Sequence, residues 1–155
     1  MSHQHTALIK WHCTSPDFLQ GRYSREHTWT FDGGLTVAAS PAPSVVPAPW
    51  SNPAHVDPEE AFVASLASCH MLTFLWVAGR DGFQAGSYED NAVGEMTKNE
   101  QGVPWVSKVT LRPRIAWSGA KLPTPEDLDH LHHLAHKQCF IANSVKTEIV
   151  VEQVT

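Results

Sequence analysis

Two cysteines, Cys69 and Cys139, are the residues of this chain whose types and placement could support redox chemistry. The 155 residues hold three cysteines, and the third is Cys13. A count so low and odd does not suit the disulfide framework of a small secreted protein. Two thiols that can approach one another could reduce a peroxide, with one cysteine attacking it and the other resolving the sulfenic acid as a disulfide.

Each cysteine also has a plain structural interpretation, because free cysteine is among the most buried residue types. A reactive thiolate needs a nearby cation or hydrogen-bond donors. On a helix, His70 would project about 100° away from Cys69, so it is a poor partner, and an activating arginine must come from elsewhere in the fold. Sequence spacing alone leaves open whether Cys139 approaches Cys69.

A histidine-rich segment from Asp129 to His136 offers a different chemistry. His132 and His136 stand four residues apart, on one face of a predicted helix, as zinc ligands can. No glutamate lies where a zinc protease needs one, and no third ligand is evident nearby. A solvated helix face is therefore favoured over a metal-binding module. A cysteine hydrolase is disfavoured, because the interior of a buried helix is a poor place for a peptide substrate.

The helix that would carry Cys69 is the most clearly marked element. Asp57 is a natural N-cap, Pro58 suits the first helical position, and Glu60 completes a capping-box pattern. From Glu59 to Gly79 the sequence is apolar on nearly every face, which predicts a helix buried on all sides. It would be about 30 Å long. A lone domain of this size struggles to surround it, so we expect a homodimer in which two such helices pack together.

The remaining elements are read from alternation and turn signals. A hairpin is expected around Asp32-Gly33-Gly34, and the five prolines between Pro41 and Pro53 predict a surface loop. A second helix starts at Thr124 and runs to about Lys137. The expected strands are Leu8 to Trp11, His27 to Phe31, Leu35 to Ala39, Ser87 to Lys98, Val103 to Trp117 and Lys146 to Val154. This order predicts a single α+β domain over residues 1–155, with antiparallel sheets packed on long buried central helices.

Composition excludes several function classes. The net charge is −5 and the basic residues do not cluster, so nucleic acid is not an expected partner. No apolar run reaches the roughly 18 residues of a membrane span, so no membrane association is expected. The polar start, Met1 to His5, lacks the apolar stretch of a signal peptide, which predicts a cytoplasmic protein.

Two segments resemble the cysteine motifs of the OsmC/Ohr family, the osmotically induced and organic hydroperoxide resistance proteins. In the first, Asp57-Pro58-Glu59 opens a helix rich in small and apolar residues, and Cys69 follows Glu59 by ten residues. In the second, seventy residues on, Cys139 begins a segment that ends at Ser144. The order of elements is also similar, so the resemblance covers nearly the whole chain. It implies an OsmC-like intertwined homodimer with sites between subunits.

The resemblance implies a thiol-dependent peroxidase that reduces organic hydroperoxides. Cys69 would be the peroxidatic cysteine and Cys139 the resolving one, with a lipoyl-type dithiol as reductant and no metal or organic cofactor. Glu59 would fix an active-site arginine, for which Arg25 fits best and Arg22 is the other candidate. A guanidinium can hold a thiolate and polarise a peroxide, and a carboxylate can hold the guanidinium by a bidentate pair.

The chain also departs from the family pattern. His70 stands where an apolar or aromatic residue is more common, and Phe140 replaces a proline. Trp50, Phe62 and Phe140 could line an apolar substrate pocket, although simple core packing is the plainer interpretation of such residues. The alternative functions are therefore an OsmC-like protein that has lost peroxidase activity and binds a small apolar ligand, or a histidine-rich metal-binding module.

Overall fold

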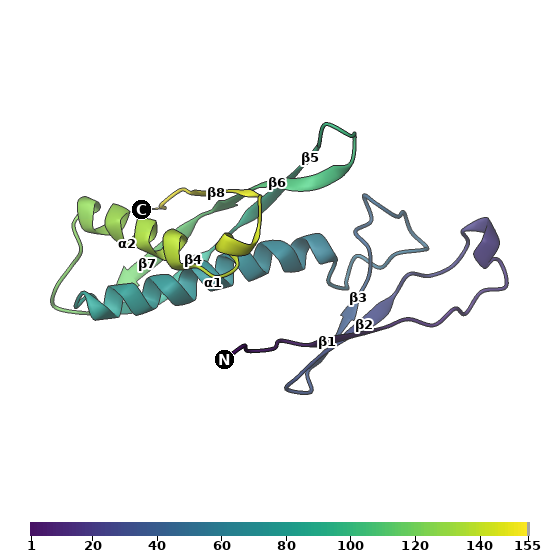
Figure 1. Cartoon of the computed structure of the whole chain (residues 1–155), viewed down its shortest axis with the longest axis horizontal. Coiled ribbons are helices and arrows are strands. Elements are labelled where there is room, and N and C mark those ends of the chain that lie inside the picture. Colours follow the sequence, from purple (N-terminus) through teal and green to yellow (C-terminus); the bar gives the residue numbers. More distant parts are fainter. Residues whose placement is uncertain (155) are drawn as a thin grey trace. The chain divides into compact units, whose positions relative to one another are not determined.

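The chain folds into two compact units, each of which is described by itself. The computed structural model describes residues 1–154. The N-terminal unit comprises Met1–Ala61, and the C-terminal unit begins at Phe62. Figure 1 shows the order of the elements along the chain, from the N-terminal strands (purple) to the C-terminal strand (yellow).

A three-stranded antiparallel sheet forms the N-terminal unit. Its strands are β1 (Ala7–Lys10), β2 (His27–Phe31) and β3 (Thr36–Ala39), in that order across the sheet. The predicted hairpin between β2 and β3 is confirmed. Gly34 has a φ of 87°, which side chains disfavour, and its N–H donates to the carbonyl of Phe31 at 2.9 Å. The proline-rich segment that follows forms turns and no helix or strand, as predicted.

The central helix α1 (Pro58–Arg80) begins with the predicted capping box. The Glu60 N–H donates to Asp57 Oδ1 at 2.7 Å, and the Asp57 N–H donates to Glu60 Oε2 at 3.2 Å. These reciprocal bonds satisfy two donors that a helix start otherwise leaves unpaired. Beyond its end, Gly82 adopts a φ of 85°, and the Phe83 N–H returns to the Ala78 carbonyl at 2.9 Å.

One face of α1 is exposed in the single chain, so the predicted burial on all sides would require a second subunit. The buried side chains are Leu66, His70, Phe74, Val77 and Ala78. Every fourth residue along the other side faces outward, namely Ala64, Ser68, Leu72 and Trp76. The side chains of Leu72 and Trp76 are 62% and 60% exposed. A helix that is apolar on both faces is stable in water only when a second surface covers the exposed face.

By length and composition alone, α1 could also cross a membrane. The expectation that no apolar run reaches such a length does not hold by this criterion, because the part of α1 from Ala61 to Gly79 contains small polar residues and His70 but no charged residue. The core helix of a folded protein meets the same criterion. In this fold α1 supplies buried side chains to both core clusters, Phe74 to one and Leu66 to the other.

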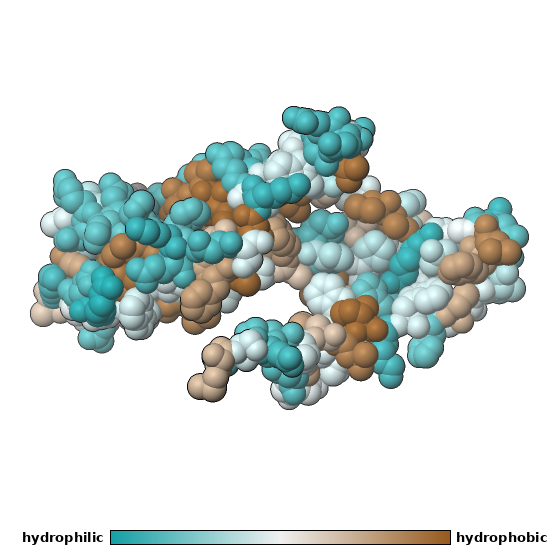
Figure 2. Space-filling model, viewed as in Figure 1, coloured by the Kyte–Doolittle hydropathy of each residue, from teal (hydrophilic) through white to brown (hydrophobic). Residues whose placement is uncertain are grey.

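Two long strands were predicted between the helices, and the structure breaks each of them in two. The resulting strands are β4 (Ala85–Asp90), β5 (Val93–Lys98), β6 (Pro104–Leu111) and β7 (Pro113–Trp117). β5 pairs with β6 around the predicted turn, whose hydrophilic tip is teal at the top of Figure 2, and β4 pairs with β7. The break has a local cause, because Pro113 has no N–H and the Arg112 N–H donates to Asp90 Oδ1 at 2.7 Å.

The second helix, α2 (Pro125–Gln138), also has the predicted start. Thr124 and Asp127 form a complete capping box. Figure 1 shows α2 lying alongside α1, and Leu131 and Ala135 of α2 share a buried cluster with Phe74 and Val77 of α1. The last strand, β8 (Glu148–Val151), pairs with β6 in parallel, which the prediction of antiparallel sheets did not include.

The approach of α1 to β5 depends on a glycine. A Cβ placed on Gly94 would lie 2.5 Å from Val63 Cγ2, well inside van der Waals contact. We expect Gly94→Ala to lower the free energy of unfolding by about 1–3 kcal/mol, as overpacked cores do. Urea unfolding measures this change. Gly33→Ala is the matched control, because nothing lies within 4 Å of its added methyl group; an equal loss in both variants would contradict the packing explanation.

Candidate thiol site

The structure brings Cys69 and Cys139 together within the C-terminal unit. Cys69 lies on α1 and is half-buried, and Cys139 follows the last residue of α2 and is buried. Burial, followed by a hydrogen bond with Cys69, raises the pKa of the Cys139 thiol to about 11. Cys139 is therefore a neutral thiol at pH 7. Both cysteines are free, so the pair is in its reduced form.

The segment after α2 folds back over the Cys139 sulfur. The Ala142 N–H donates to Cys139 Sγ at 3.4 Å. The Asn143 side-chain amide donates to the carbonyls of Lys137 and Cys139 at 3.0 and 2.9 Å, and the Cys139 carbonyl also accepts the Asn143 main-chain N–H at 3.1 Å. No role was predicted for Asn143 from the sequence. No sequence signal marked this residue, because it lies five residues beyond the end of α2 and bonds to the helix end only once the chain has turned back.

The prediction of a solvated histidine face on α2 is wrong at His132. His130, His133 and His136 are exposed, but the His132 side chain is 4% exposed. It forms a hydrogen bond with His70 of α1, with 3.0 Å between His132 Nδ1 and His70 Nε2. Among residues 1–154, no group of three or more histidine, cysteine or acidic side chains could hold a metal ion.

This histidine pair is expected to make the fold sensitive to acid. Burial, with smaller contributions from His132 and His136, lowers the pKa of His70 to about 3. Burial lowers the pKa of His132 to about 4 against the opposing charge of Asp129. In the unfolded chain both pKa values return to about 6.5, so between pH 6.5 and 4 the unfolded state binds more protons. The free energy of unfolding should therefore decrease as the pH is lowered through this range. The decrease is about 1.4 kcal/mol per pH unit for each histidine that stays neutral in the folded state.

Urea unfolding of the wild type and of His70→Leu/His132→Leu at pH 7, 6 and 5 measures this slope. The carboxylates contribute equally to the pH dependence of both proteins. The difference between the two slopes of unfolding free energy against pH therefore gives the contribution of the histidine pair. The exposed His133→Leu on the same helix is the control and should keep the wild-type slope. Identical slopes in the double variant and the wild type would contradict the expectation.

Arg25 lies in the N-terminal unit and is held by main-chain carbonyls. Its Nη1 donates to the carbonyls of Tyr23 and Gly21 at 2.7 and 3.1 Å, and its guanidinium lies 3.8 Å above the Tyr23 ring. Arg22, the other candidate, is exposed. Within residues 1–154 neither arginine forms an ion pair with Glu59.

Glu59 itself lies in the first turn of α1 and is half-buried. Its Oε2 is buried and has no hydrogen-bond partner among the described residues. A buried carboxylate oxygen without a donor is costly. The Glu59 carboxylate can therefore accept a further hydrogen bond at Oε2.

An apolar pocket of about 480 Å³ opens beside Arg25 in the N-terminal unit. Its aromatic wall is a cluster in which Phe18 stacks on Tyr23 with ring centroids 4.5 Å apart and Trp11 contacts both rings. The full lining is Ile9, Trp11, Phe18, Tyr23, Arg25, His27, Pro41 and Pro58. This pocket was not predicted from the sequence, because its aromatic residues are spaced without the period of a helix or strand.

The three residues proposed for a substrate pocket occupy other places. Trp50 is half-buried, and its carbonyl accepts the Arg25 N–H at 3.0 Å. Phe62 lines a groove of about 380 Å³ that it shares with Trp105 and the segment 144–147. Phe140 is 83% exposed. Of the three, Trp50 touches the main chain of the predicted active-site arginine.

Comparison with known families decides the classification. The family model described as "OsmC-like protein" matches residues 51–154, which is more than half of the chain and includes both cysteines. The chain belongs to the OsmC-like family. A solved OsmC-like protein of unknown function from Vibrio cholerae O1 biovar eltor is 51% identical over 99% of this chain and 100% of that one, with a TM-score of 0.95. No curated protein matches the chain.

More distant OsmC-like structures share the fold. An organic hydroperoxide resistance protein from Elizabethkingia anophelis is 19% identical over 99% of this chain and 95% of that one, with a TM-score of 0.72. One from Bacillus subtilis is 18% identical over 98% of each chain, with a TM-score of 0.69. The predicted family and α+β fold class are thereby confirmed.

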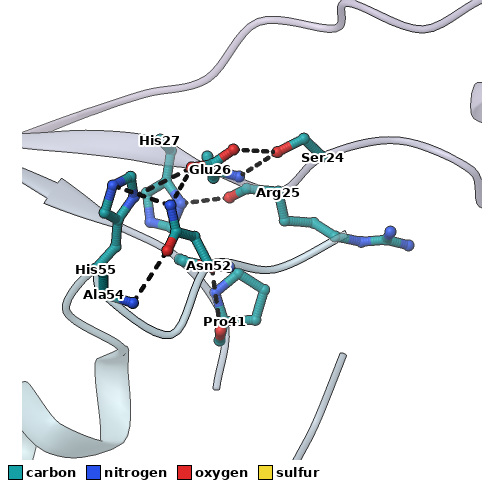
Figure 3. A network of polar contacts seen from close by, with 9 residues as sticks. Ser24, Arg25, Glu26, His27, Pro41, Asn52, Ala54 and His55 are labelled. Carbon is teal, nitrogen blue, oxygen red and sulfur yellow. Dashed lines mark hydrogen bonds and ion pairs between the residues drawn. The ribbon is translucent and has the colours of Figure 1, made fainter. Parts of the chain in front are cut away.

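In this OsmC-like chain, a polar network holds the segment that carries Arg25 (Figure 3). Asn52 Nδ2 donates to Glu26 Oε1 at 2.8 Å, and Ser24 Oγ donates to Glu26 Oε2 at 3.0 Å. These two bonds lower the pKa of the Glu26 carboxyl. His27 Nδ1 lies 2.7 Å from the Arg25 carbonyl and donates to it. Figure 3 shows the Arg25 side chain extending away from the network, so its main chain is anchored while its guanidinium stays at the pocket.

Proposed function

We propose that this OsmC-like protein is a cytoplasmic thiol peroxidase that reduces organic hydroperoxides through Cys69 and Cys139, without a metal or organic cofactor. The observation that carries the proposal is the contact between the two thiols. A half-buried cysteine beside a buried, neutral thiol is the arrangement that a peroxidatic and a resolving cysteine need. The names of the related hydroperoxide resistance proteins support the same substrate class.

The proposed oxidation proceeds in two steps, formation of a sulfenic acid on Cys69 and then of a disulfide with Cys139. The Cys69 thiolate attacks the distal oxygen of the hydroperoxide, the O–O bond breaks, and the alkoxide leaves as an alcohol after taking up a proton. Cys69 is then a sulfenic acid. The Cys139 sulfur, after losing its proton, attacks the Cys69 sulfur, so that an S–S bond forms and water leaves. A dithiol reductant, of the lipoyl type, gives up two hydrogens and restores both thiols.

Arg25 and Glu59 are the proposed supporting residues. The guanidinium of Arg25 would stabilise the thiolate and polarise the peroxide, while the pocket beside it accepts the organic group. The unpaired Oε2 of Glu59 would receive a donor from the arginine in the working site. The exposed apolar face of α1 supports a homodimer as the assembly in which the site is complete.

A mass spectrum after one equivalent of cumene hydroperoxide tests the proposal. The reduced protein should lose two hydrogen atoms, and a digest should contain a peptide linked through Cys69 and Cys139. Cys13→Ser is the control and should give the same link, because Cys13 is exposed and bonded locally to the Ser15 carbonyl. A protein that stays reduced, or that links through Cys13 instead, would refute the cysteine pair.

The pocket beside Arg25 favours a second candidate function, the binding of a small apolar ligand without catalysis. Trp11 lines that pocket and would report a bound apolar molecule through its fluorescence. A protein that stays reduced with hydroperoxide but binds cumyl alcohol, with the response lost in Trp11→Leu, would support this function over the peroxidase.

A further inference from the structure

Helix α1, which carries Cys69, and helix α2, which Cys139 directly follows, are joined by a buried hydrogen bond between histidines. His70 on α1 and His132 on α2 are 2% and 4% exposed, and the distance from His70 Nε2 to His132 Nδ1 is 3.0 Å. The ring planes are within 7° of parallel, and the His132 ring also stacks on Phe74 with centroids 4.4 Å apart. Both imidazoles are neutral at pH 7, so one ring donates and the other accepts.

The histidine pair and the cysteine pair belong to one helix interface. His70 directly follows Cys69 on α1, and His132 precedes Cys139 by seven residues, or about two helical turns, on α2. Residues seven apart share one face of a helix. The two pairs are therefore neighbours along the contact that α1 makes with α2 and with Cys139, the residue that follows α2.

The histidine contact differs in kind from its surroundings. The neighbouring contacts between α1 and α2 are apolar, made by residues such as Phe74, Leu131 and Ala135. Apolar contacts are non-directional, whereas a hydrogen bond fixes both a distance and an angle. A buried polar pair is a known means of setting the register between helices, as a single asparagine pair does in coiled coils.

The histidine pair also costs more free energy than an apolar pair at the same place would. His132 Nε2 is buried and has no hydrogen-bond partner among the described residues. Leaving a buried polar atom unpaired costs free energy, and two apolar side chains of similar size would avoid that cost. Packing alone therefore does not explain why histidines stand here.

Register matters for disulfide formation more than for the first chemical step. A disulfide needs two sulfurs at about 2.05 Å with a narrow range of dihedral angles, so a small slide of α2 along α1 would delay it. Of the two cysteines, only Cys69 takes part in the attack on the peroxide. A sulfenic acid that waits too long meets a second peroxide and becomes a sulfinic acid, which thiols do not reduce.

We propose that His70 and His132 form a positioning pair that holds α2 in register on α1 and so sets the rate at which Cys139 resolves oxidised Cys69. This role rests on the proposed peroxidase function. Neither histidine acts on the peroxide.

Two kinds of substitution test the pair. His70→Leu and His132→Leu remove the hydrogen bond. His70→Gln and His132→Asn keep it, because the glutamine amide reaches the position of Nε2 and the asparagine amide that of Nδ1. The exposed His133→Leu on α2 is the control.

Three rates are measured for each full-length variant. Sulfenic acid formation is followed in a Cys139→Ser background by dimedone trapping and mass spectrometry. Disulfide formation is followed by rapid quenching after cumene hydroperoxide. It is followed again after diamide, which takes two hydrogens from the thiol pair without any peroxide step.

The leucine variants should slow disulfide formation about tenfold with both oxidants and leave sulfenic acid formation within about twofold, since a lost buried hydrogen bond is a cost of this order. The double leucine variant should be no slower than either single one. The amide variants and His133→Leu should keep near wild-type rates. Unchanged disulfide formation in the leucine variants, or an equal slowing of sulfenic acid formation, would overturn the positioning role.

Two further outcomes are distinguishable. A wild type that ignores hydroperoxide while the diamide rates follow the expected order would refute the peroxidase and support the positioning pair. If the leucine variants do not fold, the diamide rates of His132→Gln and His132→Asn are compared instead. The longer glutamine side chain places its amide away from the position of Nδ1, so it should not form the hydrogen bond with His70. Equal diamide rates in these two variants would overturn the proposal.

Discussion

Cys69→Ser is expected to abolish hydroperoxide reduction, with a fall in rate on the order of a thousandfold or more. A serine hydroxyl in place of the thiol is a far weaker nucleophile and cannot accept oxygen from the peroxide. The measurement is the consumption of cumene or tert-butyl hydroperoxide with dihydrolipoamide as reductant. The fold should be unaffected, because the substitution exchanges one small side chain for another at a half-buried position.

The control for this variant is Cys13→Ser, which changes a cysteine in the N-terminal unit and should leave the rate unchanged. Equal rates in the wild type and Cys69→Ser would refute the mechanism as a whole. A wild type with no activity would instead favour the ligand-binding alternative. The pair of variants therefore separates catalysis by Cys69 from thiol oxidation in general.

The parts of the fold that the sequence predicted correctly are those with local causes. Both helix starts are capping boxes in which the two partners are three residues apart, Asp57 with Glu60 and Thr124 with Asp127. The hairpin at Gly34 depends on a backbone conformation that favours glycine. Signals of this kind are read within four or five residues, so no knowledge of distant contacts is required.

The errors came from contacts between distant parts of the chain. His132 was assigned to solvent by its residue type, yet it is buried because its partner, His70, lies 62 residues earlier in the sequence. The parallel pairing of β8 with β6 likewise depends on where α2 ends relative to the sheet, which no local signal shows. The break between β6 and β7 could have been predicted, because a proline such as Pro113 inside an expected strand indicates an interruption.

The candidate site was predictable only in part. Spacing does not show that Cys69 and Cys139 meet, so their pairing in the sequence analysis came from the family resemblance. The contact between them in the structure is an independent observation. The carbonyls that hold Arg25 and the aromatic pocket beside it had no sequence signal, because irregular loops leave no period.

Cys139→Ser is expected to permit a single turnover and then stop. Cys69 can still attack the hydroperoxide, so the first equivalent of peroxide should be consumed at a rate within a few-fold of the wild type. No disulfide can form afterwards, and the sulfenic acid persists until a second peroxide oxidises it to the sulfinic acid. The mass of the intact protein should then rise by two oxygen atoms, whereas the wild type should lose two hydrogens.

The burial of Cys139 makes this variant informative about roles as well as activity. Its pKa of about 11 keeps it protonated at pH 7, so the thiol that attacks first should be Cys69. A fast burst of one alcohol per Cys139→Ser chain, followed by a second alcohol as the sulfinic acid forms and the protein is inactivated, would agree with that order of events. If Cys139→Ser turned over steadily while Cys69→Ser gave the burst, the two roles would be reversed. The contact between the thiols would then remain, but Cys139 would have to be activated despite its burial.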